Sequence, residues 1–220
     1  MRGNLLVPVL LTVSVAMFVP TPFILMNAPY ETSMGEVSKI FYFHLPSAIA
    51  FLLFAFVCGI ASVVFLVGQK KTADHVALAA AEMAILCGLI TLVTGPLWAR
   101  KAWGTWWVWE ARLTSSLVMW MVFAAYLLLR RFGGAGSEML AAAVSIFGMA
   151  LVPFVYWSVN LWRTMHPTTS VVPSLPASMA RPLLWCLGAF FVFYTSLLLV
   201  RVRLARTAAA LEDAYLALEE

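Results

Sequence analysis

Charged residues are scarce in this chain. Asp, Glu, Lys and Arg make up only 11% of its 220 residues, whereas a soluble domain carries about a quarter. Hydrophobic residues make up 63%, and the mean hydropathy is +0.94. This composition excludes a sizeable soluble domain and predicts a polytopic membrane protein. The net charge of +4 lies in short connections and near the C-terminus, so it indicates membrane topology rather than nucleic-acid binding.

Paired cysteines and enzyme motifs are also lacking. Cys58, Cys87 and Cys186 each lie inside an apolar run, and none belongs to a CxxC pair. Isolated cysteines of this kind are typical small packing residues. The absence of CxxCH excludes a c-type cytochrome. No Ser-His-Asp set, Walker motif or Gly-rich nucleotide pattern occurs, so we expect a protein that is not an enzyme.

Six long apolar runs are present instead, and each is about long enough to cross a membrane as a helix. The predicted spans are residues 5–26, 40–67, 76–98, 113–129, 139–161 and 182–200. They predict an all-α polytopic membrane protein, a six-transmembrane-helix bundle without two similar halves. Pro20 and Pro22 should bend the end of the first span. Pro46 is expected in the first turn of the second span, which would place His44 at a helix N-terminus.

The distribution of charge predicts the topology. With both termini cytoplasmic, the larger share of the 14 Lys and Arg residues falls on the cytoplasmic side, as the positive-inside rule requires. Residues 1–202 then form the transmembrane domain, with outer loops at 27–39, 99–112 and 162–181. Residues 203–220 form a cytoplasmic amphipathic tail, which either continues the sixth span or packs on a partner.

Glu82 is an ionisable residue inside the third predicted span. A charge in a span is a functional candidate by default. Its shallow depth also allows it to face a partner helix or to reach the interface. The sequence leaves both interpretations open.

Tryptophan is concentrated in one stretch. Residues 98–120 hold six of the nine tryptophans, and Trp103, Trp106, Trp107 and Trp109 lie in the loop between two apolar runs. An interfacial belt explains only one or two per helix end. Four indoles with cations beside them suit a flat, apolar ligand that also carries negative charge, because the rings stack on its plane while Arg or Lys meets its acidic groups. A strongly anchored interfacial loop without a ligand is the alternative.

Two of the three histidines share the predicted side of this loop. His44 and His166 fall on the outer side, whereas His75 falls on the opposite one. Two imidazoles and an indole-lined plate are the parts of a bis-histidine haem site, and two histidines without clustered Cys, Asp or Glu make a poor zinc or copper site. The candidates for the haem propionates are Arg100, Lys101, Arg112, Arg163 and Arg181.

The motifs around these residues resemble those of a known family. WGTWWVWEARLTS (103–115) is similar to the tryptophan-rich signature of haem-handling membrane proteins. Together with six spans, FYFHLP at His44 and NLWRTMHPTTS at His166 resemble the haem exporter protein C (cytochrome c maturation protein C) family over essentially the whole chain. The resemblance implies that His44 and His166 are the axial ligands of the haem iron. The other cofactor-binding residues that it implies are Trp103, Gly104, Trp106, Trp107, Trp109, Glu110, Arg112 and Arg100, with Glu110 standing where the family commonly has Asp.

The resemblance also implies a function. It describes a protein that holds haem b as cargo at the outer face of the bacterial inner membrane and delivers it to a membrane-anchored periplasmic haem chaperone during cytochrome c biogenesis. Further implied partners are a two-part ABC transporter, a small single-span subunit and membrane lipid, but no nucleic acid. A haem permease is one alternative, although the spans hold few polar residues to line a path. A haem lyase component is another, but the chain offers no sizeable outer domain to receive an apocytochrome.

Overall fold

The structure, a computed structural model, describes residues 5–219, and all regular structure in that range is helical. Its elements are α1 (Leu6–Phe18), α2 (Thr21–Asn27), the short 3-10 helix η1 (Gly35–Ile40), α3 (Phe41–Gly68), α4 (Lys71–Trp103), α5 (Ala111–Phe132), α6 (Ser137–Leu161) and α7 (Ala177–Glu219). Six stretches are long and apolar enough to cross a membrane. The predicted all-α class with six spans is therefore confirmed, and the chain is a multi-pass membrane protein.

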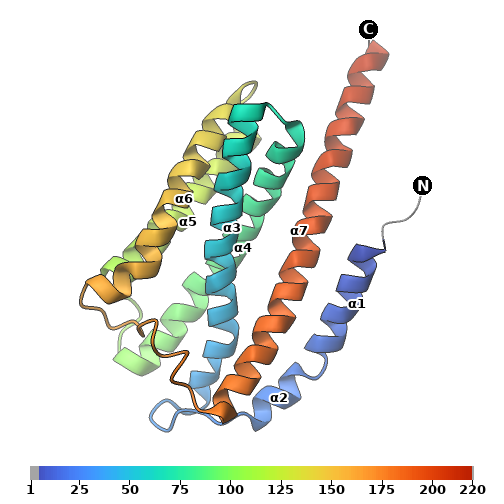
Figure 1. Cartoon of the computed structure of the whole chain (residues 1–220). Coiled ribbons are helices and arrows are strands. Elements are labelled where there is room, and N and C mark those ends of the chain that lie inside the picture. The colour runs from blue at the N-terminus through green and yellow to red at the C-terminus, as the bar shows by residue number, and fades with distance from the viewer. Residues whose placement is uncertain (1–4, 220) are drawn as a thin grey trace.

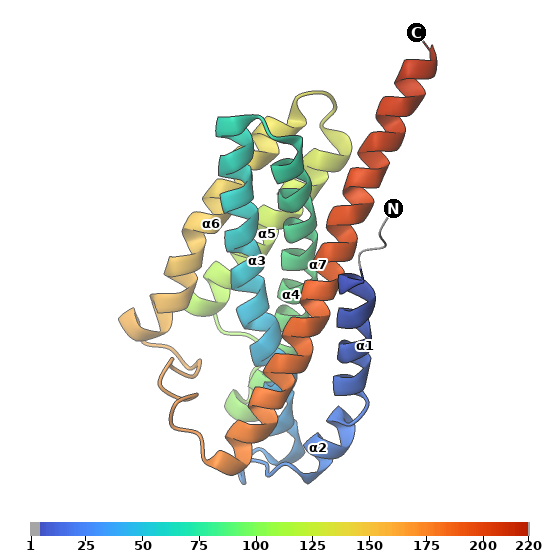
Figure 2. The same cartoon turned by 45° about the vertical axis from the view of Figure 1, so that its right-hand side comes forward.

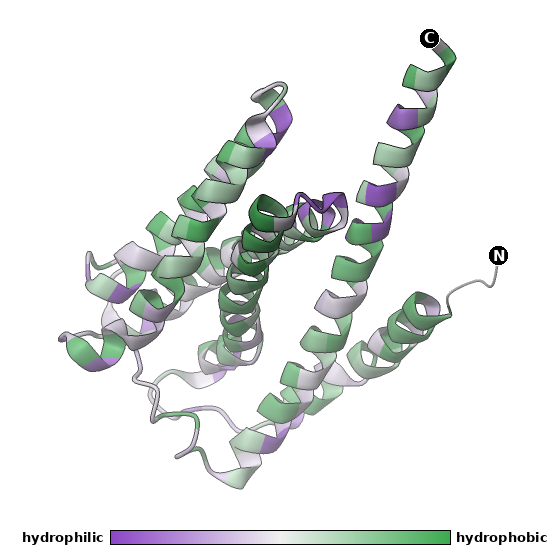
Figure 3. Ribbon diagram, turned by 45° about the horizontal axis from the view of Figure 1, so that its top comes forward, coloured by the Kyte–Doolittle hydropathy of each residue, from purple (hydrophilic) through white to green (hydrophobic). Residues whose placement is uncertain are grey.

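Helices α3 to α6 form a four-helix group, and α7 runs along this group beside α3 and α4, with α1 packed on α7 (Figures 1 and 2). The two ends of the described chain lie toward the same end of the molecule, which we call the tail end (Figure 1). The opposite end, the loop end, carries the connections 28–34, 104–110 and 162–176. We call 104–110 the tryptophan loop and 162–176 the histidine segment. Apolar residues cover the helices along their length, as expected for contact with lipid (Figure 3).

The predicted effect of Pro20 and Pro22 on the first span is confirmed, whereas the predicted position of Pro46 is wrong. The first span is interrupted as expected, since α1 ends at Phe18 and α2 begins at Thr21, beside Pro20. The prediction that Pro46 lies in the first turn of its helix is wrong. Because η1 leads directly into α3, that helix begins at Phe41 and Pro46 lies in the second turn, fully buried. His44 is consequently not at an open helix end, and its setting depends on its contacts with α4.

Small residues let the helices pack closely. On α4, Ala77, Ala80 and Ala84 are buried against the rest of the bundle, and small side chains of this kind allow close approach between membrane helices. Gly88 faces Trp120 of α5, whose indole N–H donates to the Ile85 carbonyl at 3.1 Å. The three cysteines are free and completely buried, in agreement with the packing role expected of them.

Ion pairs between helices lie toward the tail end, and they include Lys71 of α4 with Asp213 of α7 at 3.7 Å. Arg130 of α5 binds both carboxylate oxygens of Asp74 on α4, each at 2.7 Å. Arg201 of α7 donates from Nε to Glu82 of α4 at 2.6 Å. Glu82 therefore faces a partner helix, which is the structural interpretation of this residue rather than the functional one.

Helix α7 runs without a break through residue 202. The tail therefore continues the sixth span, and its Leu204, Leu211 and Tyr215 side chains are exposed. The division into a transmembrane domain and a separate tail stays a prediction.

Candidate functional site

A cavity of about 420 Å³ lies at the loop end, between α3, α4, α5, α6 and the histidine segment. This volume falls in the range of roughly 300–1,000 Å³ that is usual for small-molecule sites. His44 and His166 both line the cavity, together with Trp103, Trp107 and Arg112. Side chains from separate parts of the sequence thus meet at one place, as the sequence predicted.

The rest of the wall is mostly apolar. Trp98 belongs to it and contacts Trp103 edge to face, with the ring centroids 5.6 Å apart. Sequence reasoning did not include Trp98 among the site residues, although it opens the tryptophan-rich stretch. Other apolar wall residues are Leu45, Ile49, Phe51, Leu52, Leu92, Val155 and Val159. Such a wall keeps water from the face of a bound apolar ligand.

His44 lies in the first turn of α3 and its ring is held from α4. Its Nδ1 atom is 2.9 Å from Oγ1 of Thr94. Among the described residues no hydrogen bond engages its Nε2 atom, which leaves that nitrogen available to a ligand in the cavity.

His166 also leaves its Nε2 atom available, but its Nδ1 atom has a partner in its own loop. Its Nδ1 atom lies 2.9 Å from the Pro167 carbonyl oxygen, which can only accept, so Nδ1 carries the proton and Nε2 keeps its lone pair. Burial lowers the pKa of His166 below its ordinary value, and the positive charge of Arg112 lowers it further, against smaller opposing effects of Pro167 and Glu110. His166 is therefore a neutral imidazole at neutral pH, which is the form that binds metals.

Glu110 does not line the cavity, and its carboxylate instead holds the histidine segment. One oxygen accepts a hydrogen bond from the Thr164 hydroxyl at 2.6 Å, and the other accepts from the Met165 backbone N–H at 2.8 Å. Thr164 Oγ1 in turn accepts from the His166 backbone N–H at 3.0 Å. The carboxylate of Glu110 thus connects the tryptophan loop to the segment that holds His166, and the cofactor-binding role that the resemblance implies for Glu110 stays a prediction.

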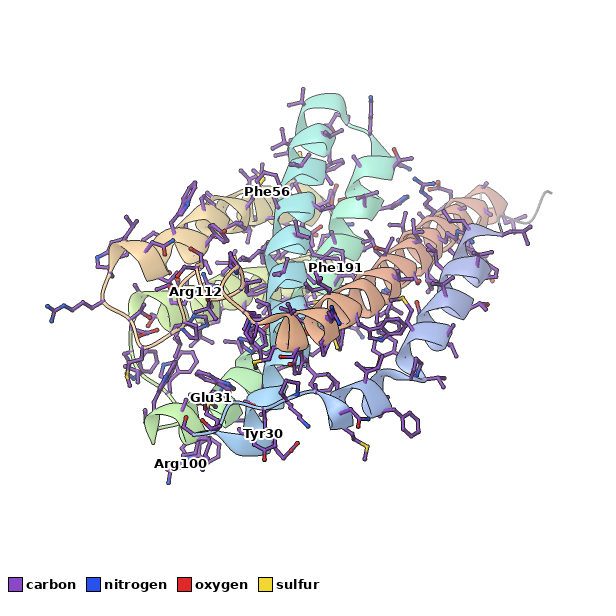
Figure 4. The ribbon with its side chains drawn as sticks, turned by 60° about the horizontal axis from the view of Figure 1, so that its bottom comes forward. Tyr30, Glu31, Phe56, Arg100, Arg112 and Phe191 are labelled. Atoms are coloured by element: carbon purple, nitrogen blue, oxygen red, sulfur yellow. The ribbon has the colours of Figure 1, made fainter. Side chains whose placement is uncertain are left out.

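Of the five cations considered for the propionates, only Arg112 lines the cavity. Its Nη1 atom donates to the Val155 carbonyl of α6 at 2.5 Å. Arg100 lies at the periphery, where it donates to the Gly104 carbonyl and its guanidinium is 6.0 Å from the Trp106 ring centroid (Figure 4). The remaining three, Lys101, Arg163 and Arg181, are exposed.

The tryptophan loop divides its side chains between two surroundings. It begins with Gly104 at φ +75°, a left-handed conformation that ends α4 at little cost only for glycine. Trp106 and Trp109 are 56% and 76% exposed and lie outside the cavity, as does Gly104. Trp107 lines the cavity, and its buried Nε1–H has no hydrogen-bond partner in the described part of the chain. An unpaired buried donor in a cavity wall fits an acceptor on a ligand.

These features fit a flat, acidic ligand that carries its own metal. No group of three or more His, Cys, Asp or Glu side chains among residues 5–219 could hold a bare metal ion. An iron that is already bound in the plane of a porphyrin needs only two axial ligands, a number that two histidines can supply. The indoles of Trp103 and Trp107 suit its apolar plane, and Arg112 suits its acidic edge.

Comparisons with known proteins agree with this geometry. The family model described as "Heme exporter protein C" matches residues 1–214. The chain belongs to the haem exporter protein C family. Its relatives include the Heme exporter protein C of Haemophilus influenzae, 34% identical over 187 residues that cover 80% of this chain and 74% of the relative. The protein of the same name from Escherichia coli K12 is 33% identical over 183 residues, 80% of this chain and 73% of its own.

Members of the family also occur outside bacteria. A "Putative cytochrome c biosynthesis ccmC-like mitochondrial protein" of Marchantia polymorpha is 34% identical over 167 residues, which cover 74% of this chain and 72% of that protein. The family resemblance predicted from the three motifs is thereby confirmed.

Two threonines of the site were not found by sequence reasoning. Thr94 lies behind His44, and Thr164 lies between Glu110 and His166. A signal for Thr94 is the run Thr-Gly-Pro at 94–96, because a proline next to a glycine interrupts the backbone hydrogen bonds of a helix and marks a local irregularity. Thr164 has no comparable signal, since its partners come from another loop.

Proposed function

We propose that this protein binds haem b as cargo at the outer face of the bacterial inner membrane and delivers it to a membrane-anchored periplasmic haem chaperone during cytochrome c biogenesis. The observation that carries the proposal is the meeting of His44 and His166 in one indole-lined cavity. In the described part of the chain no hydrogen bond engages Nε2 of either ring, and these two nitrogens would hold the iron from its two axial sides. The names of the relatives, which refer to haem export and cytochrome c biosynthesis, support the same substrate.

The remaining wall residues would position the porphyrin. Trp103 and Trp107 pack against its plane, and the guanidinium of Arg112 neutralises an acidic side group. The unpaired Nε1–H of Trp107 offers a hydrogen bond to an acceptor on the same ligand. The bound haem itself supplies the iron and the conjugated ring. The chain orients the haem, excludes water from its faces and neutralises its acidic side group.

The two axial ligands are held unequally, which suits transfer. His44 belongs to a membrane-spanning helix and is backed by α4, whereas His166 lies in a loop that Glu110 and Thr164 hold in place. Movement of the histidine segment would remove one ligand without disturbing any span. We infer that His166 is the ligand that is released when haem leaves.

We favour a cavity that takes up and releases haem at the loop end over a path by which haem would pass through the helix bundle. Directly behind the cavity, Cys87, Met119 and Phe123 are completely buried and close the bundle with side chains that offer no route for a charged ligand. The protein then works by binding and transfer rather than catalysis. The two-part ABC transporter and the small single-span subunit are proposed as partners, and membrane lipid would cover the exposed apolar faces of the spans.

The test is an absorption spectrum of the purified full-length protein, oxidised and reduced. The wild type should show a six-coordinate haem, with extraction identifying haem b. His166→Ala should retain haem with an altered spectrum, and His44→Ala should lose the bis-histidine signature. His75→Ala is the matched control, because His75 lies outside the cavity near the tail end and its loss should leave the spectrum unchanged. A haem-free wild type, or identical spectra in all variants, would refute the proposal.

A further inference from the structure

Helix α4 carries a Thr-Gly-Pro run at residues 94–96, inside its span and beside the first turn of α3. Pro96 has no backbone N–H, so it cannot donate to the Leu92 carbonyl one turn earlier. Gly95 and Pro96 line the cavity, and Thr94 contacts the His44 ring. Helix α4 therefore lacks one backbone hydrogen bond next to the residues that contact His44.

The Thr94 hydroxyl determines which nitrogen of His44 carries the proton. Its oxygen lies 2.6 Å from the Ile90 carbonyl and 2.9 Å from Nδ1 of His44. A carbonyl can only accept, so the single hydroxyl proton is donated to Ile90. Toward His44 the hydroxyl oxygen can then only accept, which requires a proton on Nδ1. The lone pair of a neutral ring is consequently on Nε2.

Gly95 sets the position of the same ring by leaving space for it. A Cβ atom at residue 95 would lie 3.3 Å from Cε1 of His44, which is closer than an ordinary carbon contact, and 3.9 Å from Nδ1. The imidazole therefore lies against bare backbone, one residue from its hydrogen-bond partner. These two contacts, one polar and one steric, restrain both the tautomer and the plane of the ring.

We propose that Thr94 and Gly95 are positioning residues that hold His44 in the Nδ1–H form, with Nε2 presented to haem iron before haem arrives. This inference rests on the proposed function in so far as His44 is an iron ligand. Histidines that bind metals usually donate their other N–H to a fixed partner, and loss of that partner typically weakens metal binding by about 10- to 100-fold. His166 has only the adjacent Pro167 carbonyl for this purpose, whereas His44 has a partner on another helix.

The first measurement needs no haem. Nitrogen-15 NMR of the histidine rings in the haem-free, full-length protein distinguishes the two neutral tautomers, and only three histidines contribute signals. His44 should be in the Nδ1–H form in the wild type and in Thr94→Ser, which keeps the hydroxyl. Thr94→Val is nearly the same size but has no acceptor, and should move His44 toward the Nε2–H form.

The second measurement uses haem binding and the midpoint potential of the bound iron. Thr94→Val should weaken binding by about tenfold or more and raise the potential, because an imidazole that donates its N–H gives more electron density to ferric iron. Thr94→Ser should stay close to the wild type. Thr91→Val is the comparator: Thr91 lines the same wall, but its hydroxyl donates only to the Cys87 carbonyl at 2.8 Å, so its effect should be clearly smaller.

Gly95→Ala separates the steric contact from the polar one. It retains the Thr94 hydroxyl and favours the helix by propensity, so it should tilt the ring and alter the haem spectrum while His44 stays in the Nδ1–H form.

The inference is overturned if His44 of the wild type is in the Nε2–H form. It is also overturned if Thr91→Val changes haem affinity and midpoint potential as much as Thr94→Val does. A wild type that binds no haem would refute the proposed function and leave the tautomer result standing.

Discussion

Glu110 lies outside the cavity, yet its contacts determine where His166 lies. Its carboxylate accepts hydrogen bonds from Thr164 and from the Met165 backbone, directly before His166. Hydrogen bonds to a charged acceptor contribute about 1.5–3 kcal/mol each. A single side chain of the tryptophan loop therefore holds the histidine segment in place directly before His166.

Glu110→Ala should speed haem loss, because the histidine segment loses both contacts. One such bond corresponds to about a tenfold change in rate, so we expect dissociation to become at least about tenfold faster when apomyoglobin takes up the released haem. Glu110→Asp, with a shorter reach, should be intermediate. Glu212→Ala removes an exposed carboxylate of the tail and serves as the control. Equal rates for Glu110→Ala and Glu212→Ala would show that these hydrogen bonds do not retain haem.

His166 should titrate at lower pH than an ordinary histidine. Its pKa is lowered by burial and by Arg112, so as the pH falls through about 6.5 an unfolded chain takes up a proton while the folded ring stays neutral. Acidification from about pH 6.5 toward the lowered pKa of His166 therefore destabilises the folded segment, and at higher pH this loss of stability is absent. NMR titration of the haem-free protein should give a midpoint below 6.5 for His166. In Arg112→Gln the midpoint should rise, and that of His75 should not move.

At the scale of single residues the sequence predicted identities better than orientations. His44 and His166 were expected on one side of the membrane and line one cavity, whereas of five unranked cations only Arg112 does. Trp106 and Trp109 were expected in the same platform but are exposed. Composition shows that a loop is rich in indoles, but which indoles turn inward depends on backbone geometry and on neighbours from other helices.

At the scale of helices the apolar runs located every span but not its ends. The third predicted span, 76–98, is a helix from Lys71 to Trp103, and its last turn includes Arg100 and Lys101. Hydropathy marks where the membrane ends, whereas backbone hydrogen bonds continue until a residue such as Gly104 stops them. The same difference explains why α7 extends far beyond the predicted end of its span at residue 200.

The contact between α4 and α5 requires a glycine at position 88. A Cβ atom there would lie 2.6 Å from Cδ1 of Trp120, so Gly88→Ala should force the indole away from its bond to the Ile85 carbonyl. Overpacking of this kind costs about 1–3 kcal/mol, which should appear as a lower Tm in detergent. Gly68→Ala is the control, because its Cβ would meet only the flexible Lys70 side chain, at 3.5 Å. A Tm unchanged by Gly88→Ala would show that the two helices can separate freely.

For the whole molecule, six spans require that both described ends lie on one side, and Figure 1 agrees. The charge distribution predicts that this side is the cytoplasm. Single cysteines can test this, since the three native thiols are buried. Ser174→Cys in the histidine segment should react with a membrane-impermeant maleimide added outside spheroplasts, whereas Thr207→Cys on the tail should react only after the membrane is opened. The reverse pattern would invert the topology and place the cavity on the cytoplasmic side.

The burial of all three cysteines also affects the chemistry that the cavity permits. Sulfur is a strong axial donor to haem iron and, when oxidised, a sink for its electrons. None of the residues around the cavity is a cysteine. A haem held in the cavity would therefore meet no cysteine sulfur that competes with the histidines for its iron or exchanges electrons with it.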